Sequence, residues 1–421
     1  MSTEAKKRMS LPVRIMTGMV LGVIVGYLVG PKIEVIGFVG TIFLRLLRMC
    51  IYPLVLISII TGVASVVDIS RLKKVGAGFL LYTAITSSIA ATLSIIAMKI
   101  SGAGKGVVIK GVEEVDKVAK VNVLGSFLDW IPDNPFSAMS NGNLIQIIVF
   151  ALLFGIMLAS IRTTESGQLV AKAMDGLNEI VNRMVGWVIG LAPYGVFALM
   201  AVIVGTTGVE VMGGVAKMLL TMYASLAAFI LIVLPVILYF VAGVNPLRHF
   251  RNVYAVMVMA ATTGSSAATI PVTMKSAKER CGVPKDIVDL LTAPAATMNM
   301  NGAAMEYPIC VLFTAQVFGI EYGLTQLAFL VALGVIMSCG AAGVPGGGIM
   351  MCAICCSIMG LPETIVPIFA GVYSIIDIGT TMLNVTSDTV GMVTISSRLK
   401  ELDRDVFYGR KTVPDTSGRF A

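Results

Sequence analysis

The chain has 421 residues, of which 57% are hydrophobic and 13% charged, and its mean hydropathy is +0.90. Soluble domains are typically about 45–50% apolar and about 25% charged, so this chain cannot cover a water-facing surface and must be surrounded by lipid. The net charge of +7 is compatible with nucleic-acid binding, but the positive residues are distributed as membrane topology requires, and we expect no nucleic-acid partner.

The first half of the chain is a series of apolar stretches, each close to the roughly 20 residues that a helix needs to cross a bilayer. We expect membrane spans at 11–30, 35–66, 75–99, 143–161, 182–206 and 212–243. The stretch 11–30 follows three basic residues but is too long for a cleavable signal peptide, so we interpret it as the first membrane helix. A polar stretch, 102–142, separates the third span from the fourth.

From about residue 249, clusters of small polar residues break the apolar segments. The four broken segments are 252–274, 286–320, 325–360 and 363–397. Irregular backbone at membrane depth is tolerated only inside protein or beside a water-filled cavity. The order also repeats, with a hairpin-like segment followed by a span with a polar break, which is typical of inverted-repeat transporters.

Lysine and arginine placement predicts the orientation. If the N-terminus is cytoplasmic and 252–274 and 325–360 are re-entrant hairpins, most of the 31 Lys and Arg residues lie on the cytoplasmic side, as the positive-inside rule requires. We therefore expect a multi-pass protein of the cytoplasmic (inner) membrane with both termini in the cytoplasm.

One segment carries a stripe of polar residues at helical spacing, namely Asp377, Thr380, Thr381, Asn384 and Asp388. On a helix these side chains share a face. Hydroxyl and amide groups alone could be helix–helix contacts, but two acids inside the membrane are costly and indicate ligand or cation binding. The turn Asn299–Gly302 offers carbonyls and amides to a cation such as Na⁺, and the tips 263–269 and 340–348 offer N–H groups to a substrate carboxylate.

The sequence disfavours an enzyme. His249 is the one histidine, and it is expected at the cytoplasmic edge, far from Ser265 and Ser266, so a Ser–His protease is unsupported. Metal hydrolysis would need a ligand cluster that the chain lacks. The cysteines at 352, 355 and 356 could be considered as a metal site, but small apolar packing explains them better. A channel remains an alternative, which concentrative, ion-dependent uptake would exclude.

Four motifs carry a family resemblance: TGSSAATIPVT at 263–273, NMNGAA at 299–304, GAAGVPGGG at 340–348 and DIGTTMLNVTSD at 377–388. Together they resemble the dicarboxylate/amino acid:cation symporter family, which includes glutamate transporters and neutral amino acid exchangers. The resemblance implies an all-α membrane protein, a homotrimer, with eight transmembrane helices plus two re-entrant hairpins and an elevator mechanism.

The implied domain organisation alternates scaffold and transport parts. It comprises scaffold helices at 1–74, a transport-domain helix at 75–101, a polar loop and scaffold helices at 102–210, a transport-domain helix at 211–248, the transport core at 249–398 and a cytoplasmic tail at 399–421.

The resemblance also implies the site. Asp377 would hold the substrate ammonium, and Asn384, with Thr381 nearby, its carboxylate. The remaining substrate-binding positions would be Ser266, Met300, Ala303, Val344, Gly346 and Thr380. Three sodium sites would be formed by Asp388 with carbonyls of Ala295, Asn299 and Asn384, by Thr297 with the backbone of Ser338–Ala341, and by Thr86, Ser87, Asn299 and Asn301.

Three departures from the family pattern favour a neutral substrate. Thr380 stands where acidic-substrate members carry Arg, Gly264 where some archaeal members carry another Arg, and Ala303 where the family has Thr. Lys and Arg are absent from 286–397 and 252–274, and burying an unpaired carboxylate costs several kcal/mol. We expect sodium-coupled symport or exchange of a small neutral amino acid; the alternative is acidic amino acid or dicarboxylate symport with Na⁺ or H⁺.

Two further departures concern coupling. Asn301 replaces the family's aspartate and removes a carboxylate from the third cation site, which predicts fewer coupled cations. Glu306 is a candidate proton carrier, but animal glutamate transporters carry their proton-handling Glu one position later, where this chain has Tyr307. One residue is about 100° of helix, so that role does not transfer directly.

Overall fold

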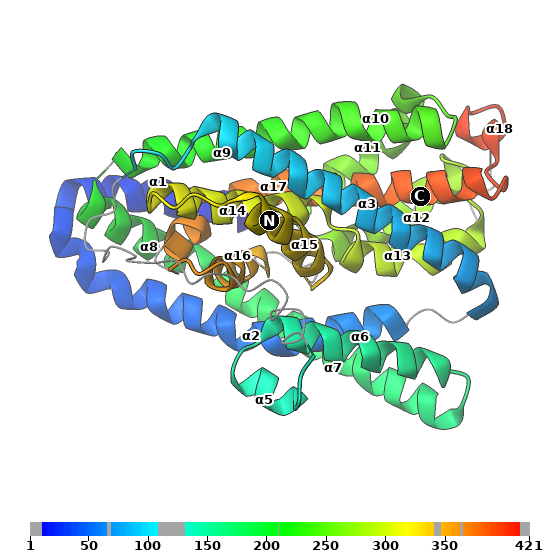
Figure 1. Ribbon diagram of the computed structural model, residues 1–421, viewed down its shortest axis with the longest axis horizontal. Coiled ribbons are helices and arrows are strands. Elements are labelled where there is room, and N and C mark those ends of the chain that lie inside the picture. The colour runs from blue at the N-terminus through cyan, green and yellow to red at the C-terminus, as the bar shows by residue number, and fades with distance from the viewer. Residues whose placement is uncertain are drawn as a thin grey trace, which may run out of the picture.

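The computed structural model describes residues 11–64, 69–107, 131–208, 210–340, 347–362 and 365–412, and the regular elements in these ranges are all helical (Figure 1). Within these ranges four helical stretches are long and apolar enough to cross a membrane, and a bent helix pair raises this to five. The four are Val13–Ala64, Val75–Ser101, Val211–Val241 and Val366–Arg398. The expected all-α membrane protein is confirmed.

The first stretch contains two helices, as the sequence predicted. Helix α1 (Leu11–Val29) leads through the 3₁₀ turn η1 (Gly30–Ile36) into α2 (Gly37–Ala64), and the chain turns back between them (Figure 1). Helix α1 packs closely on α8 because Gly18, Gly22 and Gly26 face it: a Cβ on any of the three would lie 2.4 or 2.5 Å from a carbonyl oxygen of α8. Small residues spaced by four allow this approach of two backbones.

The next helices are α3 (Ile69–Ser101), α5 (Pro135–Ser140), α6 (Leu144–Ser160), α7 (Glu165–Gly190) and α8 (Ala192–Thr207). The span predicted over 182–206 corresponds to a bent helix pair, in which α7 begins well before residue 182 and is bent by 49° against α8. Pro193 lies in the first turn of α8. Its missing N–H and its ring prevent a helix from continuing through this point.

The long helical stretch that follows contains two wide turns. It consists of α9 (Glu210–Ala228), η2 (Phe229–Val233), α10 (Leu234–Val236) and η3 (Ile237–Val241), of which η2 and η3 are π-helical. Pro235 lies between them in α10. A proline disturbs the regular hydrogen bonding of an α-helix, and π-helical structure occurs mostly as single turns inside α-helices.

Two helix pairs, α11–α12 and α15–α16, lie where the sequence predicts hairpins. Helices α11 (Pro246–Thr263) and α12 (Ser266–Glu279) meet at Gly264, whose φ of +59° ends α11, while the Ser265 side chain caps α12. The two open ends are joined because Asn252 Nδ2 donates to the carbonyl oxygen of Arg280 at 2.8 Å. Helices α15 (Leu324–Gly340) and α16 (Gly347–Ile358) flank the second tip, whose residues 341–346 lie outside the described ranges.

The remaining helices are α13 (Lys285–Met298), α14 (Asn301–Val317), α17 (Val366–Arg398) and the short α18 (Arg404–Phe407). The break at 299–302 is confirmed, but the break predicted within 363–397 is wrong: α17 is continuous for 33 residues. The hydroxyls of Thr380, Thr386 and Thr389 donate to carbonyls three or four residues back in α17. Its polar side chains are thus accommodated without any interruption of the backbone.

Candidate functional site

The break between α13 and α14 lies directly against α17. Asn299 and Met300 have ψ angles of 64° and 70°, far from helical values, and both are buried. Helix α14 then begins with its second residue held to α17, since Gly302 N donates to Asn384 Oδ1 at 2.7 Å. A Cβ on Gly302 would lie 2.4 Å from the carbonyl oxygen of Thr380. The absence of a side chain here therefore permits the unwound turn to touch the polar stripe.

Asp388 and Asn299 form a buried pair suited to a cation. Asn299 Nδ2 donates to Asp388 Oδ1 at 2.8 Å, and Asp388 is 2% exposed. Asn299 Oδ1 is buried and has no hydrogen-bond partner among the described residues. An orphaned amide oxygen beside a buried carboxylate is costly unless something pairs with it. Both groups, together with unwound backbone carbonyls, are the donors that a sodium ion takes in broken-helix transporters.

The Asn301 side chain makes one hydrogen bond at each end of its amide. Ser87 Oγ donates to Asn301 Oδ1 at 2.8 Å, and Asn301 Nδ2 donates to Ser387 Oγ at 2.5 Å. Ser387 Oγ in turn lies 3.0 Å from the hydroxyl of Tyr82. The structure thus brings together Ser87 and Asn301 as predicted. Tyr82 and Ser387 complete the network and were missed, although Ser387 adjoins Asp388 in the sequence.

The other predicted cation ligands that the structure describes make hydrogen bonds within their own helices or with the turn that follows. Thr86 Oγ1 donates to the carbonyl of Tyr82 within α3, and Ser338 Oγ to that of Val335 within α15. Thr297 Oγ1 donates to the carbonyl of Pro294 and lies against Gly62 of α2. Ala295 is buried, and its carbonyl accepts the N–H of Asn299. Three further predicted positions, Ala341, Val344 and Gly346, lie outside the described residues.

Asp377 lies at the tip of the first hairpin. The position of a Cβ on Gly264 would be 3.0 Å from Asp377 Oδ2, so a larger residue at the tip would displace the carboxylate. Thr381 Oγ1 donates to Asp377 Oδ1 at 3.2 Å, and the hydroxyl of Tyr373 lies 3.5 Å from the same oxygen. Within the described part of the chain no Lys or Arg pairs with Asp377. Tyr373 was missed by the sequence analysis, although it stands four residues before Asp377 on the same helix face.

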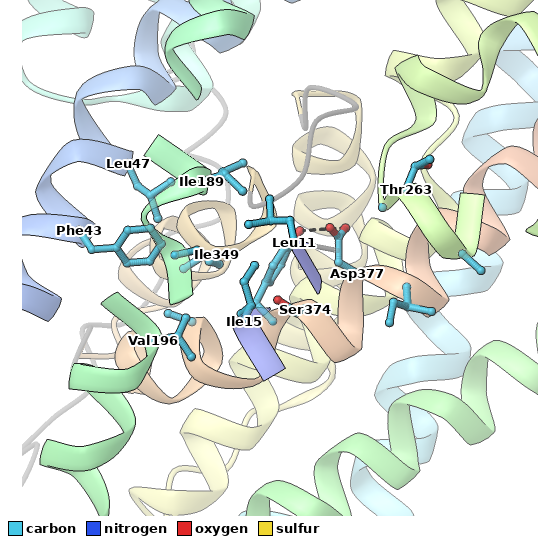
Figure 2. A pocket seen from close by; sticks show the side chains of 16 residues that line it. Leu11, Ile15, Phe43, Leu47, Ile189, Val196, Thr263, Ile349, Ser374 and Asp377 are labelled. Carbon is cyan, nitrogen blue, oxygen red and sulfur yellow. Dashed lines mark hydrogen bonds between the residues drawn. The ribbon is translucent and has the colours of Figure 1, made fainter. Parts of the chain in front are cut away.

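A small cavity opens beside Asp377 (Figure 2). Its volume is ≈ 100 Å³, and its lining is mostly apolar, with Leu11 and Ile15 from α1, Thr263 from α11 and Ser374 from α17 around the carboxylate. Among the predicted substrate-binding positions, Asp377 is the one that lines it. The others in the described ranges, which are Ser266, Met300, Ala303, Thr380, Thr381 and Asn384, are buried around the helix break.

Glu306 lies deeper, between α14 and α16. It is 3% exposed, and Cys352 Sγ donates to its Oε1 at 3.5 Å. A Cβ on Gly348 would lie 2.5 Å from both Glu306 Oε1 and the hydroxyl of Tyr373, so these two groups converge on the same glycine. Gly348 N donates to the Tyr373 hydroxyl at 3.0 Å. Within the described ranges no three His, Cys, Asp or Glu residues form a metal-binding group.

A helix broken in the protein interior, acids without a Lys or Arg partner among the described residues and an apolar exterior are typical of a membrane transport protein. A family model for the "Sodium:dicarboxylate symporter family" matches residues 11–398. The chain belongs to this family. It is therefore a cation-coupled symporter and not an enzyme.

Named relatives span nearly the whole chain. It is 29% identical to the proton/sodium-glutamate symport protein of Geobacillus stearothermophilus over 402 residues, covering 93% of this chain and 94% of that protein. It is 30% identical to the L-cystine uptake protein TcyP of Bacillus thuringiensis over 431 residues, covering 96% of this chain and 92% of that protein.

Proposed function

We propose that the protein takes up a small neutral amino acid, such as alanine, serine or threonine, by sodium-coupled symport or exchange. The observation that carries this proposal is the environment of Thr380. Its side chain is 2% exposed, and its hydroxyl donates to carbonyls of its own helix, Ile376 at 3.2 Å and Asp377 at 3.3 Å. An acidic substrate side chain would find neither a cation nor a free donor at this position.

The neighbouring positions support the same substrate class. Ala303 is buried and offers no hydrogen-bonding side chain, and Gly264 at the hairpin tip offers no charge. Burying an unpaired carboxylate costs several kcal/mol even after relaxation. A neutral side chain avoids that cost, whereas the substrate ammonium is matched by Asp377.

The proposed role of each residue depends on which of its polar atoms can still bind substrate. Asp377, which accepts from Thr381, holds the ammonium. Asn384 Oδ1 is taken by Gly302 N, so its Nδ2 is the group that faces the substrate carboxylate. The backbone at Ser266, Val344 and Gly346 closes over the ligand.

Sodium is proposed to bind where Asp388 and Asn299 meet, with carbonyls of Ala295 and Asn384, and the ion would supply the positive charge that the buried carboxylate lacks. A second site at Thr297 and the backbone of Ser338–Ala341 is proposed on the resemblance alone. The third, at Thr86, Ser87, Asn299 and Asn301, is weakened because Asn301 is a neutral amide that already makes hydrogen bonds with Ser87 and Ser387.

We further propose the family architecture for this chain, with eight transmembrane helices and the hairpins α11–α12 and α15–α16 in a homotrimer of the cytoplasmic membrane, both termini inside. The scaffold is 1–74 and 102–210, and the moving parts are 75–101 and 211–398, with a tail at 399–421. The cavity at Asp377 supports an elevator because its walls come from both groups: α1, α2 and α8 on one side, α11 and α17 on the other.

A second candidate is an acidic substrate moved with Na⁺ or H⁺. The Geobacillus relative, which is named a proton/sodium-glutamate symport protein, favours it. Glu306 also favours it. This buried carboxyl group accepts a weak hydrogen bond from the thiol of Cys352, and it would serve as the proton carrier.

The test is uptake of radiolabelled serine into proteoliposomes, with competitors at equal concentration and with Na⁺, K⁺ and H⁺ gradients varied singly. Alanine, serine and threonine should compete best, and an inward sodium gradient should drive accumulation. Stronger competition by aspartate or succinate would assign the acidic class instead, and cystine belongs in the panel because of the TcyP relatives.

A further inference from the structure

A groove on the outer face of the first hairpin combines two arginines with apolar side chains. It is lined by residues of η2 and α11 and by the residue that follows α12, which are Ile230, Leu231, Phe250, Arg251, Tyr254, Ala255, Met257 and Arg280. Its volume is ≈ 770 Å³. Tyr254 and Leu231 are 67% and 68% exposed, as befits a surface in contact with hydrocarbon.

The two arginines are neighbours at the open end of the hairpin. Arg251 precedes Asn252, whose side chain donates to the carbonyl oxygen of Arg280 at 2.8 Å. Both side chains are exposed, and neither guanidinium has an acidic partner among the described residues. Glu279, the nearest acid in sequence, lies 3.9 Å from Lys275 instead. The groove lining itself contains no Asp or Glu in the described residues.

Two exposed guanidinium groups beside an apolar groove match the chemistry of one kind of molecule. Guanidinium binds phosphate by paired charge-assisted hydrogen bonds, and basic pockets between membrane helices bind anionic lipid headgroups. The apolar walls from Leu231, Tyr254 and Met257 continue from the arginines along the helices and offer contact to acyl chains. A soluble anion would leave these walls uncovered.

We propose that this groove binds an anionic phospholipid, with the phosphate held by Arg251 and Arg280 and the acyl chains along η2 and α11. The lipid would connect η2 with the α11–α12 hairpin. The opposite end of that hairpin is the tip at Gly264, which lies against Asp377. The site is independent of which substrate is transported.

Native mass spectrometry of the purified full chain in detergent tests the proposal. Phosphatidylglycerol and phosphatidylcholine with identical acyl chains are titrated separately. We expect phosphatidylglycerol to bind more tightly, and the Arg251→Gln/Arg280→Gln variant to lose about 30-fold in affinity, or about five-fold for each arginine. Leu231→Ala should weaken binding of both lipids, since it shortens the apolar wall.

The matched control is Arg183→Gln/Arg410→Gln, which also removes two surface arginines, each paired with an acid elsewhere on the molecule. It should bind phosphatidylglycerol as the wild type does. Equal binding of both lipids, wild-type affinity in the groove variant, or displacement of the lipid by millimolar glycerol 3-phosphate would each overturn the proposal. Elution of each variant at the wild-type volume on size exclusion shows that it has folded.

Discussion

At the scale of single residues, the candidate site contains two aspartates, Asp377 and Asp388, whose hydrogen-bond partners among the described residues are uncharged. Asp377 accepts from Thr381 and lies near the Tyr373 hydroxyl, and Asp388 accepts from Asn299. Asp388 is buried and Asp377 half-buried, and hydrogen bonds from neutral groups compensate such a carboxylate only in part. Both carboxylates are therefore poised for positive charge from outside the chain, which suits a substrate ammonium at one and a cation at the other.

Replacing Asp377 by Asn should abolish binding of the amino acid while leaving assembly intact. The ammonium would lose its fixed negative partner, and removing one member of a buried charge pair costs about 3–5 kcal/mol, or at least about 100-fold in affinity. Isothermal titration calorimetry with serine measures this directly. The control is Asp175→Asn on the exposed face of α7, and unchanged affinity in the Asp377 variant would remove this residue from the site.

Replacing Thr380 by Arg should shift the preference toward acidic substrates. A guanidinium offers a bidentate partner to a carboxylate, but it must displace the close packing of Thr380 against Gly302. We expect about a tenfold gain in competition by aspartate against labelled serine, less than a full charge-assisted pair would give. The near-isosteric Thr380→Val should show no gain. A folded arginine variant that still ignores aspartate would contradict the placement.

At the scale of elements, close contacts between helices rest on glycines. Gly302 lets α14 touch α17, and Gly18, Gly22 and Gly26 let α1 touch α8. In a membrane the hydrophobic effect does not press helices together, so close packing supplies much of the association. These glycines are local features of the sequence, but the backbone that each one meets is distant along the chain.

Gly302→Ala should impair both stability and transport. The added methyl would lie 2.4 Å from the carbonyl oxygen of Thr380, so α14 must move away from α17 and the Gly302–Asn384 hydrogen bond must stretch. Overpacking of this kind costs about 1–3 kcal/mol. Thermal unfolding in detergent and serine uptake both report it. Gly176→Ala on α7, where a Cβ meets nothing within 4 Å, should leave both measurements unchanged.

The short helix α18 should loosen at low pH. Asp403 accepts from the Lys411 side chain at 3.0 Å and caps α18 by accepting from Asp405 N and Val406 N. The hydrogen bond from Lys411, then that from Val406, lowers the pKa of Asp403 below its ordinary value. A group with a depressed folded pKa stabilises the fold above its unfolded pKa, about 3.9 for Asp, and this contribution is lost as pH falls through the folded pKa.

Hydrogen exchange of the α18 amides should therefore quicken below about pH 4, after correction for the intrinsic pH dependence of exchange. In Asp403→Asn, whose amide can still cap the helix but does not titrate, this change should disappear. A variant that loosens at the same pH as the wild type would show that another group is responsible.

At the scale of the whole molecule, the network around Asn301 joins helices from three parts of the chain. Ser87 comes from α3, Asn301 from α14, and Ser387 from α17. It fills, with neutral hydrogen bonds, the place where the family resemblance implies a third cation. The coupling ratio is a property of the assembled protein, because it depends on which of the candidate sites holds an ion through the transport cycle.

We therefore expect fewer than three sodium ions per substrate. An amide offers a dehydrated sodium ion only a dipole, whereas a carboxylate neutralises it, and burial enlarges that difference. Reversal potentials in proteoliposomes measure the ratio. Asn301→Asp should add a sodium ion or tighten sodium binding, and Asn178→Asp on α7 is the control. A wild-type ratio of three would defeat this argument, and uptake indifferent to sodium would point to protons at Glu306.

The sequence by itself determined the membrane setting, the helix break at Asn299–Gly302 and the polar stripe from Asp377 to Asp388. These follow from hydropathy and helical periodicity, which are properties of short stretches of the sequence. Only the tertiary structure decided that α17 is unbroken, that α7 and α8 bend at Pro193, and that Gly264 lies on Asp377. It alone showed that Tyr82, Tyr373 and Ser387 hydrogen-bond with one another or with the candidate site residues. A hydrogen bond such as Ser87–Asn301 joins residues 214 positions apart, and no local pattern records which distant helix will supply the partner.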